Sequence, residues 1–360
     1  MKTYPLKSIT VEEATQKQFQ LIDEITKVFK GAEILTRGDL GVIPGYNRPV
    51  TTSKVEEVIA NVFHAEAAML VRGAGTMAIR LALYASLPKN GTLLVHEAPI
   101  YKTTQTTIDM LGLDIIRVDF NDLGQLTEVL ENREINGALV QLTRQKPDDS
   151  YDSQEVIKLI REINSEISII TDDNYAVMKI PKIGVEQGAN LSCFSTFKLL
   201  GPEGVGCIVG DKQTIQYLRQ ENYSGGLQVQ GHEAIDVLKG LIYAPVSLAI
   251  SAKVADEVCE RLNTGEIDAV KEAFVANAQS KVILVTFNEP IAKEVLKQAE
   301  KLGAAPNPVG AESQYEFVPM FYRVSSTFKE AIPNVEENTI RINPMRAGAD
   351  TIIRILKNSI

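Results

Sequence analysis

Short apolar runs alternate with helix-spaced segments over most of the 360-residue chain. A helical spacing of apolar residues over 10–31 ends at Gly31, and a segment rich in Gly and Pro follows over 37–53. Strand-like runs come next, at 68–71, 92–95, 115–118, 138–142, 168–171, 192–194 and 206–209. Helical patterns separate the first five runs, and this alternation predicts an α/β fold. We expect a mostly parallel sheet of about seven strands, covered by helices on both faces.

The pattern changes beyond Gly210, where longer helical segments dominate. The expected elements are helices over 231–262, 266–280 and 289–303, an alternating strand over 315–324, a short strand over 339–342 and a last helix. This mixture predicts a smaller α+β domain. We therefore expect three parts, namely an N-terminal helix and arm over 1–45, a large domain over 46–245 and a small C-terminal domain over 246–360.

The composition is that of an ordinary globular protein, with 44% apolar and 23% charged residues. The net charge of −9 argues against a general nucleic-acid or anionic-membrane surface. Three cysteines without CxxC spacing and three histidines without a ligand pattern predict neither a disulfide framework nor a metal site. The N-terminus lacks an apolar signal core, and the longest apolar stretch, 241–252, contains proline and is too short to span a bilayer. We expect a soluble, cytoplasmic protein.

Lys198 has unusual surroundings for an amine. It is the only charged side chain between Glu186 and Glu203, and its neighbours over 194–200 are mostly apolar. Apolar surroundings disfavour the charged form of an amine, and a lysine held in this way suits Schiff-base or proton-transfer chemistry. The alternative is a surface lysine on a loop beside a core strand.

A glycine-containing turn joins the run at 68–71 to a helical segment. The N-terminus of a helix presents unpaired N–H groups and the positive end of the helix dipole, so this turn suits a phosphate. The spacing of Gly73, Gly75 and Ala78, with Glu97 22 residues beyond Gly75, also fits the dinucleotide fingerprint. Three interpretations stay open here: a phosphate site, an NAD-binding Rossmann unit, and a plain strand-to-helix turn.

Residues suited to one cofactor follow the strand-like runs, at the sheet edge where ligands of parallel α/β folds gather. They are Thr76, Tyr101, Thr143, Arg144, Asp172, Asp173, Ser195 and Lys198. Together they offer an amine, a carboxylate, an aromatic face and phosphate donors. Pyridoxal 5′-phosphate (PLP) requires these four parts, for its aldehyde, its ring nitrogen, its ring face and its phosphate. We therefore expect PLP as the cofactor.

Over roughly 40–350 the chain resembles fold-type I PLP-dependent enzymes, of the aminotransferase and cystathionine synthase/lyase superfamily. The stretch 168–181 resembles the strand that ends in an acid contacting the ring nitrogen, and Asp173 matches this acid better than Asp172. The stretch 195–206 is similar to the Ser-x-x-Lys element and to the lysine turn of class V aminotransferases.

The resemblance implies roles for the side chains around this turn. Lys198 is expected to hold PLP as an internal aldimine, and Tyr101 is expected to stack on the ring. These two residues form the expected catalytic set together with the acid. Gly75, Thr76 and Ser195 are expected to hold the phosphate.

The stretch 45–49 resembles the Tyr-x-Arg element of cystathionine enzymes. In that family both residues reach the phosphate of the neighbouring subunit. The resemblance therefore implies a homodimer with shared active sites, in which Tyr46 and Arg48 act in trans.

Two further arginines are candidates for binding an amino-acid substrate. Arg341 resembles the arginine that binds the substrate carboxylate, and Arg346 is the near alternative. Arg144 lies in a stretch that lacks the asparagine contacting the ring hydroxyl in many aminotransferases, and Arg144 or Thr143 is expected to substitute for it.

The resemblance leaves the reaction type open. We expect an aminotransferase-like reaction at the α-carbon of a small amino acid. A lyase that breaks a C–S bond or eliminates a β or γ group, as in sulfur amino-acid metabolism, is the alternative. More remote alternatives are an NAD-dependent dehydrogenase and a PLP-fold protein that serves only for binding.

Overall fold

The computed structural model describes residues 2–277, 281–309, 312–324 and 335–360. The chain forms two compact units. The larger unit comprises Thr15–Leu142 and Tyr151–Ala244, and the smaller unit comprises Met1–Ala14, Thr143–Ser150 and Pro245–Ile360. The smaller unit thus includes segments 1–14 and 143–150, which the sequence-based division assigned to the N-terminal arm and the large domain.

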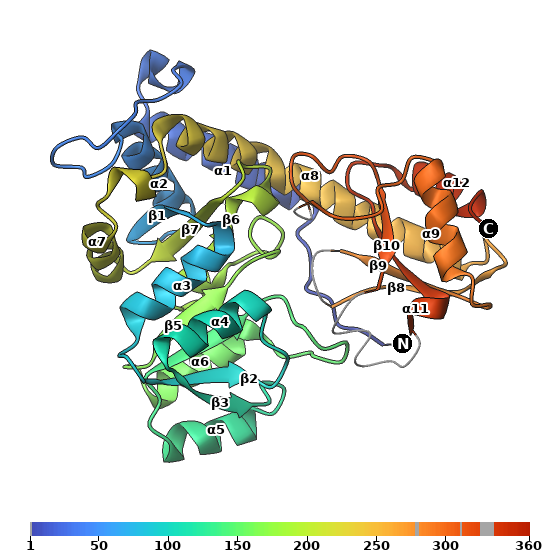
Figure 1. Cartoon of the computed structure of the whole chain (residues 1–360), viewed down its shortest axis with the longest axis horizontal. Coiled ribbons are helices and arrows are strands. Elements are labelled where there is room, and N and C mark those ends of the chain that lie inside the picture. The colour runs from blue at the N-terminus through green and yellow to red at the C-terminus, as the bar shows by residue number, and fades with distance from the viewer. Residues whose placement is uncertain (1, 278–280, 310–311, 325–334) are drawn as a thin grey trace. The chain divides into compact units, whose positions relative to one another are not determined.

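The larger unit is built on a seven-stranded sheet with strand order β1-β7-β6-β5-β4-β2-β3 (Figure 1). The strands are β1 Ala67–Arg72, β2 Thr92–His96, β3 Asp114–Val118, β4 Gly137–Gln141, β5 Ser168–Asp172, β6 Leu191–Ser195 and β7 Val205–Gly210. Strands β2 to β6 pair in parallel, whereas β7 runs antiparallel to both of its neighbours. The expected mostly parallel sheet of seven strands is confirmed.

Helices cover both faces of this sheet, because successive strand residues point to opposite sides. Leu93 packs in a cluster with α3, α4 and α7, whereas its neighbour Leu94 packs in a second cluster with α5 and α6. Ile170 and Ile169 divide between the two clusters in the same way. The helices of this unit, with two that continue into the smaller unit, are α1 Val11–Val28, α2 Val50–Val62, α3 Ala74–Ser86, α4 Lys102–Leu111, α5 Leu123–Asn132, α6 Ser153–Ile163, α7 Lys212–Glu221 and α8 Gly231–Asn263.

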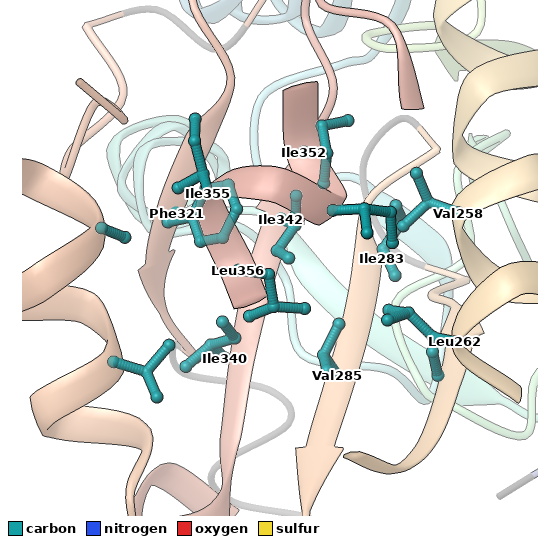
Figure 2. Packing of buried hydrophobic residues seen from close by; sticks show 14 of the residues in the cluster. Val258, Leu262, Ile283, Val285, Phe321, Ile340, Ile342, Ile352, Ile355 and Leu356 are labelled. Atoms are coloured by element: carbon teal, nitrogen blue, oxygen red, sulfur yellow. The ribbon is translucent and has the colours of Figure 1, made fainter. Parts of the chain in front are cut away.

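The smaller unit contains a four-stranded antiparallel sheet with order β10-β11-β9-β8. Its strands are β8 Val270–Val275, β9 Ile283–Phe287, β10 Met320–Arg323 and β11 Thr339–Asn343, and its helices include α9 Ala292–Lys301, α11 Val335–Asn338 and α12 Ala349–Lys357. Figure 2 shows its apolar core, in which Ile283, Val285 and Ile342 of the sheet meet Ile352 and Leu356 of α12. The expected small α+β domain is confirmed.

One expected element of the smaller unit is wrong. The helix expected over 266–280 is replaced by β8, which pairs antiparallel with β9. Ile267, Val270 and Phe274 have the spacing of one helix face, but they also fit a short strand, and the partner strand decides between the two. The last part of that expected helix, 278–280, lies outside the described residues.

Among the described residues, one helical stretch, 225–263, is long and apolar enough to cross a membrane by length and composition. However, 61% of its most apolar window is buried within the protein. Buried core helices pass the same test, so the stretch is weak evidence for a membrane span.

Candidate functional site

The candidate site lies at the ends of two neighbouring parallel strands, β5 and β6. Asp172 is the last residue of β5, and Ser195 is the last residue of β6. A short 3₁₀ turn, Thr196–Leu199, follows β6 and carries Lys198. Because parallel strands end at the same edge of a sheet, the acid and the amine come together there.

Asn174 links these side chains. Its Nδ2 donates to Asp172 Oδ1 at 2.8 Å, and its Oδ1 accepts from the backbone N–H of Ser195 at 3.0 Å. The same Oδ1 lies 3.4 Å from Nζ of the half-buried Lys198. The ring of Tyr175 lies below this amine, with its centroid 4.1 Å from Nζ. One carboxamide therefore holds the acid, the amine and the end of β6 in register.

Asp172 and Asp173 face different surroundings. Asp172 is half-buried and interacts with Asn174, Gln141 and the charge of Lys198. Burial is the largest influence on its carboxyl and raises its pKa, while these partners act in the opposite direction. The contacts of Asp172, rather than those of Asp173, put a carboxylate on the side of the lysine.

Asp173 belongs instead to a buried network beneath the site. Its side chain is fully buried, and burial raises its pKa to about 7. Its Oδ1 accepts from the backbone N–H of Gly184 at 2.8 Å, and its Oδ2 accepts from the Thr171 hydroxyl at 2.5 Å. That hydroxyl also lies 3.1 Å from the Ser192 hydroxyl. These contacts anchor the connection between β5 and β6.

The glycine turn before α3 packs against the same site. Gly73 and Ala74 adopt left-handed backbone conformations, and both N–H groups donate to the carbonyl of Gly204, at 2.7 and 3.1 Å. This pairing ties the turn to the loop that follows Lys198. A Cβ at Gly75 would lie 2.8 Å from the amide atoms of Asn174, so the close approach requires glycine.

Thr76 and Tyr101 stand on neighbouring helices at this edge. Thr76 lies in the first turn of α3, and its hydroxyl is 3.2 Å from the hydroxyl of Thr103 in α4. Tyr101 precedes α4 directly and is 67% exposed, so its ring is accessible. The amides of Gly75 and Thr76 in the first turn of α3 have no carbonyl partner within the helix, so they suit an anion.

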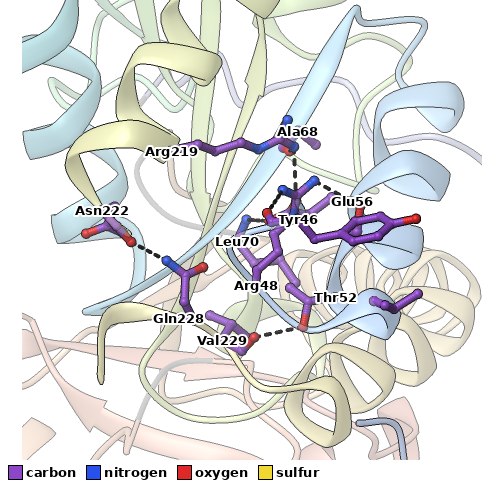
Figure 3. A network of polar contacts seen from close by, with 12 residues as sticks. Tyr46, Arg48, Thr52, Glu56, Ala68, Leu70, Arg219, Asn222, Gln228 and Val229 are labelled. Atoms are coloured by element: carbon purple, nitrogen blue, oxygen red, sulfur yellow. Dashed lines mark hydrogen bonds and ion pairs between the residues drawn. The ribbon is translucent and has the colours of Figure 1, made fainter. Parts of the chain in front are cut away.

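Arg48 is engaged inside its own chain (Figure 3). Its Nε lies 2.7 Å from the carboxylate of the buried Glu56, and its two terminal nitrogens donate to the Tyr46 carbonyl at 2.8 Å and the Ser53 hydroxyl at 2.9 Å. Arg219 approaches the same carboxylate at 3.0 Å. Arg48 thus has an ion-pair partner and two hydrogen-bond acceptors within its own chain, whereas the Tyr46 side chain is 48% exposed.

The expected substrate arginines belong to the smaller unit. Arg341 lies in β11, is 5% exposed and stands over the Tyr322 ring, 6.0 Å from its centroid. Arg346 follows this strand and is half-buried. Arg144 is also buried and donates to the carbonyl of Tyr4, and Thr143 beside it is buried.

Sequence reasoning missed three residues of the site. Asn174 was given no role of its own, although its amide is the central contact. Gln141 and Tyr175 were not considered. Gln141 could have been found because it ends β4, the strand beside β5. No simple signal marks Tyr175, because its position depends on a left-handed backbone conformation.

Comparison with known families decides between the interpretations left open by the glycine turn. The model of the family described as "Aminotransferase class-V" matches residues 47–239, and that of "YhfS-like, C-terminal domain" matches 256–356. The chain belongs to the aminotransferase class-V family. This family is PLP-dependent, so the expected fold-type I relationship and the expected cofactor are confirmed. The NAD-binding interpretation is not supported.

Full-length relatives agree with this assignment. The uncharacterized protein YhfS of Escherichia coli (strain K12) is 53% identical over 360 residues, covering 100% of this chain and 99% of the relative. A crystal structure of Escherichia coli YhfS, described as a pyridoxal-5′-phosphate dependent protein, has the same identity, covers 100% of this chain and 99% of its own, and superposes with a TM-score of 0.98.

More distant structures share the fold alone. A putative cystathionine β-lyase from Clostridium acetobutylicum is 16% identical with a TM-score of 0.73, covering 97% of this chain and 90% of its own. The cystathionine γ-lyase CalE6 from Micromonospora echinospora is 14% identical with a TM-score of 0.75, covering 95% and 98%.

The residues gathered at this edge fit PLP. The half-buried amine of Lys198 and the carboxylate of Asp172 are linked by one amide, which suits an aldehyde and a ring nitrogen on the same molecule. Gly75 allows the start of α3 to pack closely against Asn174, so the first-turn amides of α3 lie at this edge and suit a phosphate. Among the described residues, no group of three or more metal-ligating side chains is present.

Proposed function

We propose that this protein is a PLP-dependent enzyme that acts at the α-carbon of a small amino acid, with Lys198 as the residue that bonds the cofactor. The observation that carries this proposal is the contact of Lys198 Nζ with Asn174, whose amide also holds Asp172 at 2.8 Å. When bound, PLP supplies an electron-accepting ring that stabilises negative charge at the substrate α-carbon.

Asp172 is the proposed partner of the ring nitrogen. Burial raises the pKa of its carboxyl, and a protonated ring nitrogen opposite it would favour the charged carboxylate. Asp173, the first choice from the sequence, is given a supporting role, because both of its oxygens already accept hydrogen bonds beneath the site.

Residues on the adjoining elements are proposed to bind the phosphate of PLP and to cover one face of its ring. Gly75 and Thr76 at the start of α3 are proposed to hold the phosphate, together with Ser195 at the end of β6. The exposed ring of Tyr101 is proposed to cover one ring face.

Lys198 has a second proposed task, to move the α-proton of the substrate. Its amine sits in a half-buried place and is held by an amide oxygen and an aromatic ring, so it stays near the reacting atoms after the substrate displaces it. Arg341 is the proposed ligand of the substrate carboxylate, as a bidentate pair, with Arg346 as the alternative and Arg144 as a further candidate.

A homodimer with shared active sites is proposed as the assembled form. The arm before α2 supports it, because Leu35 is 83% exposed and Leu40 is 67% exposed, which is unusual for residues of this type. Tyr46 stays a candidate for contact with the partner's phosphate. Arg48 is a candidate for the same contact, although within this chain it lies against Glu56, the Tyr46 carbonyl and the Ser53 hydroxyl.

We propose aminotransferase-like chemistry first. A β- or γ-eliminating lyase is the second candidate, because the stretch 45–49 resembles the Tyr-x-Arg element of cystathionine enzymes.

Product analysis with a panel of small amino acids separates these candidates. An aminotransferase releases an oxo acid from the first substrate without ammonia, and a second oxo acid restores activity. A lyase releases ammonia together with the leaving group. Lys198→Ala is expected to abolish either reaction, and Lys179→Ala is the matched lysine control. Full activity in Lys198→Ala would refute the proposal.

A further inference from the structure

Tyr175 lies within reach of two lysines. Its ring centroid is 4.1 Å from Nζ of Lys198 and 5.2 Å from Nζ of Lys179, which is only 7% exposed. Both distances fall within the range of about 6 Å at which a cation is attracted to an aromatic ring. A half-buried ring that faces two amines is an uncommon arrangement, because the two positive charges repel each other.

The backbone that carries this ring is strained. Tyr175 has a φ of 66° and Met178 a φ of 62°, in the left-handed region that bulky residues avoid. The carbonyl of Asp173 accepts from Ala176 N–H at 2.9 Å and from Val177 N–H at 3.3 Å, which holds this turn in place. Strain of this kind persists only where the surrounding structure enforces it, and it gathers at functional sites.

The charges around Lys198 show how the Tyr175 ring contributes to holding its ammonium group. Asp172 attracts the amine, and its carboxyl is shared with the amide groups of Asn174. Lys179 on the same ring repels the amine. Asn174 offers only a neutral oxygen at 3.4 Å. The negative face of an aromatic ring is a further attraction for the ammonium, and it does not depend on a proton.

We propose that Tyr175 is a positioning residue, whose ring holds the Lys198 ammonium beside Asn174 whenever this lysine is not bonded to the cofactor. The inference rests on the proposed function of Lys198. In this account the strained turn places the Tyr175 ring against Lys198, because the freed lysine must stay near the substrate to move a proton. The ring acts through Lys198 and does not itself touch the reacting atoms.

The test uses the full-length chain stripped of cofactor. Acetic anhydride at neutral pH labels neutral amines, and peptide mass spectrometry gives the labelling rate of Lys198. Tyr175 is replaced by Phe, by phenylalanines with increasing ring fluorination, and by Leu. Fluorination keeps the ring shape and weakens its attraction for cations, so packing alone would not respond to it.

The labelling rate of Lys198 is expected to be similar for wild type and Tyr175→Phe. It should rise stepwise with fluorination and be about two- to fivefold faster in Tyr175→Leu, because the charged form of the amine loses its support. A flat series would overturn the proposal, as would a Tyr175→Phe variant that equals Tyr175→Leu. If Tyr175→Leu does not fold, as judged by circular dichroism, the fluorinated series decides alone.

Failure of this inference is distinguishable from failure of the proposed function. Labelling needs no cofactor, so it reports the ring contact alone. Borohydride reduction of the cofactor-loaded wild type reports the Lys198 bond alone. A flat labelling series with cofactor fixed on Lys198 removes only the role of Tyr175.

Discussion

Glu56 and Asp172 are both carboxylates of the larger unit, yet their surroundings differ. Glu56 is 2% exposed and meets Arg48 at 2.7 Å, Arg219 at 3.0 Å and the backbone N–H of Leu70 at 2.9 Å. Asp172 is half-buried and accepts hydrogen bonds from the backbone N–H and the Nδ2 of Asn174, at 3.1 and 2.8 Å. A carboxylate paired with two arginines stabilises the fold, whereas a carboxylate held by neutral amides beside a lysine is a candidate for chemistry.

The largest expected effect separates the two acids of the site. Asp172→Asn should lower kcat/KM by about 10²–10⁴-fold, because an amide cannot favour the proton on the ring nitrogen. Asp173→Asn should lower it by less than about tenfold, because Asn can still accept from Gly184 and contact Thr171. Steady-state kinetics on the identified substrate measures both variants.

The two substitutions serve as controls for each other, since both exchange a carboxylate for an amide at adjacent positions. The reverse order of effects would assign the ring nitrogen to Asp173 and contradict the geometry.

The next effect concerns the Glu56 cluster. Arg48→Ala leaves a buried carboxylate with one arginine fewer, and we expect the free energy of unfolding to fall by about 3–5 kcal/mol. Urea unfolding followed by circular dichroism measures this change. The exposed Arg37 of the same arm is the matched control, and Arg37→Ala should change stability little. Loss of cofactor affinity in Arg48→Ala with unchanged stability would instead support a phosphate contact in trans.

The last expected effect is spread over a range of pH and is therefore the smallest at any one pH step: a pH dependence of stability. Burial raises the pKa of Asp173 from its usual 3.8 to about 7, so the folded protein holds this proton more tightly than the unfolded chain. The contribution of Asp173 to the free energy of unfolding therefore falls as pH rises from about 4 to about 7, and it is level above that range.

Asp173→Asn removes this contribution. Its stability relative to wild type should increase across that window, by about 4 kcal/mol in total, and denaturant unfolding at several pH values measures it. A difference that does not change with pH would show that the buried acid keeps an ordinary pKa.

The sequence was informative wherever burial forces a simple pattern. Strands buried on both faces read as short apolar runs, so β1 to β7 could be located, and the strand–helix alternation predicted their mostly parallel pairing. The segment 266–280 was not predictable in the same way, because its apolar spacing fits helix and strand alike and β9 supplied the deciding partner.

Some residues of the candidate site could likewise be predicted from the sequence, and others could not. Lys198 could be singled out because it is an isolated charge in apolar sequence. The choice between Asp172 and Asp173 was not available from sequence, because adjacent residues point to opposite sides and nothing local tells which side the lysine occupies. The contact with Tyr175 depends on a left-handed backbone at that residue, which residue type does not predict.

One measurement tests the central assignment most directly: reduction of the cofactor-loaded protein with borohydride, followed by peptide mass spectrometry of the modified lysine. We predict that the reduced cofactor is found on Lys198. The neighbouring Lys179, on the same tyrosine ring, is a built-in comparison. Modification of Lys179 in place of Lys198, or of neither lysine, would contradict the account.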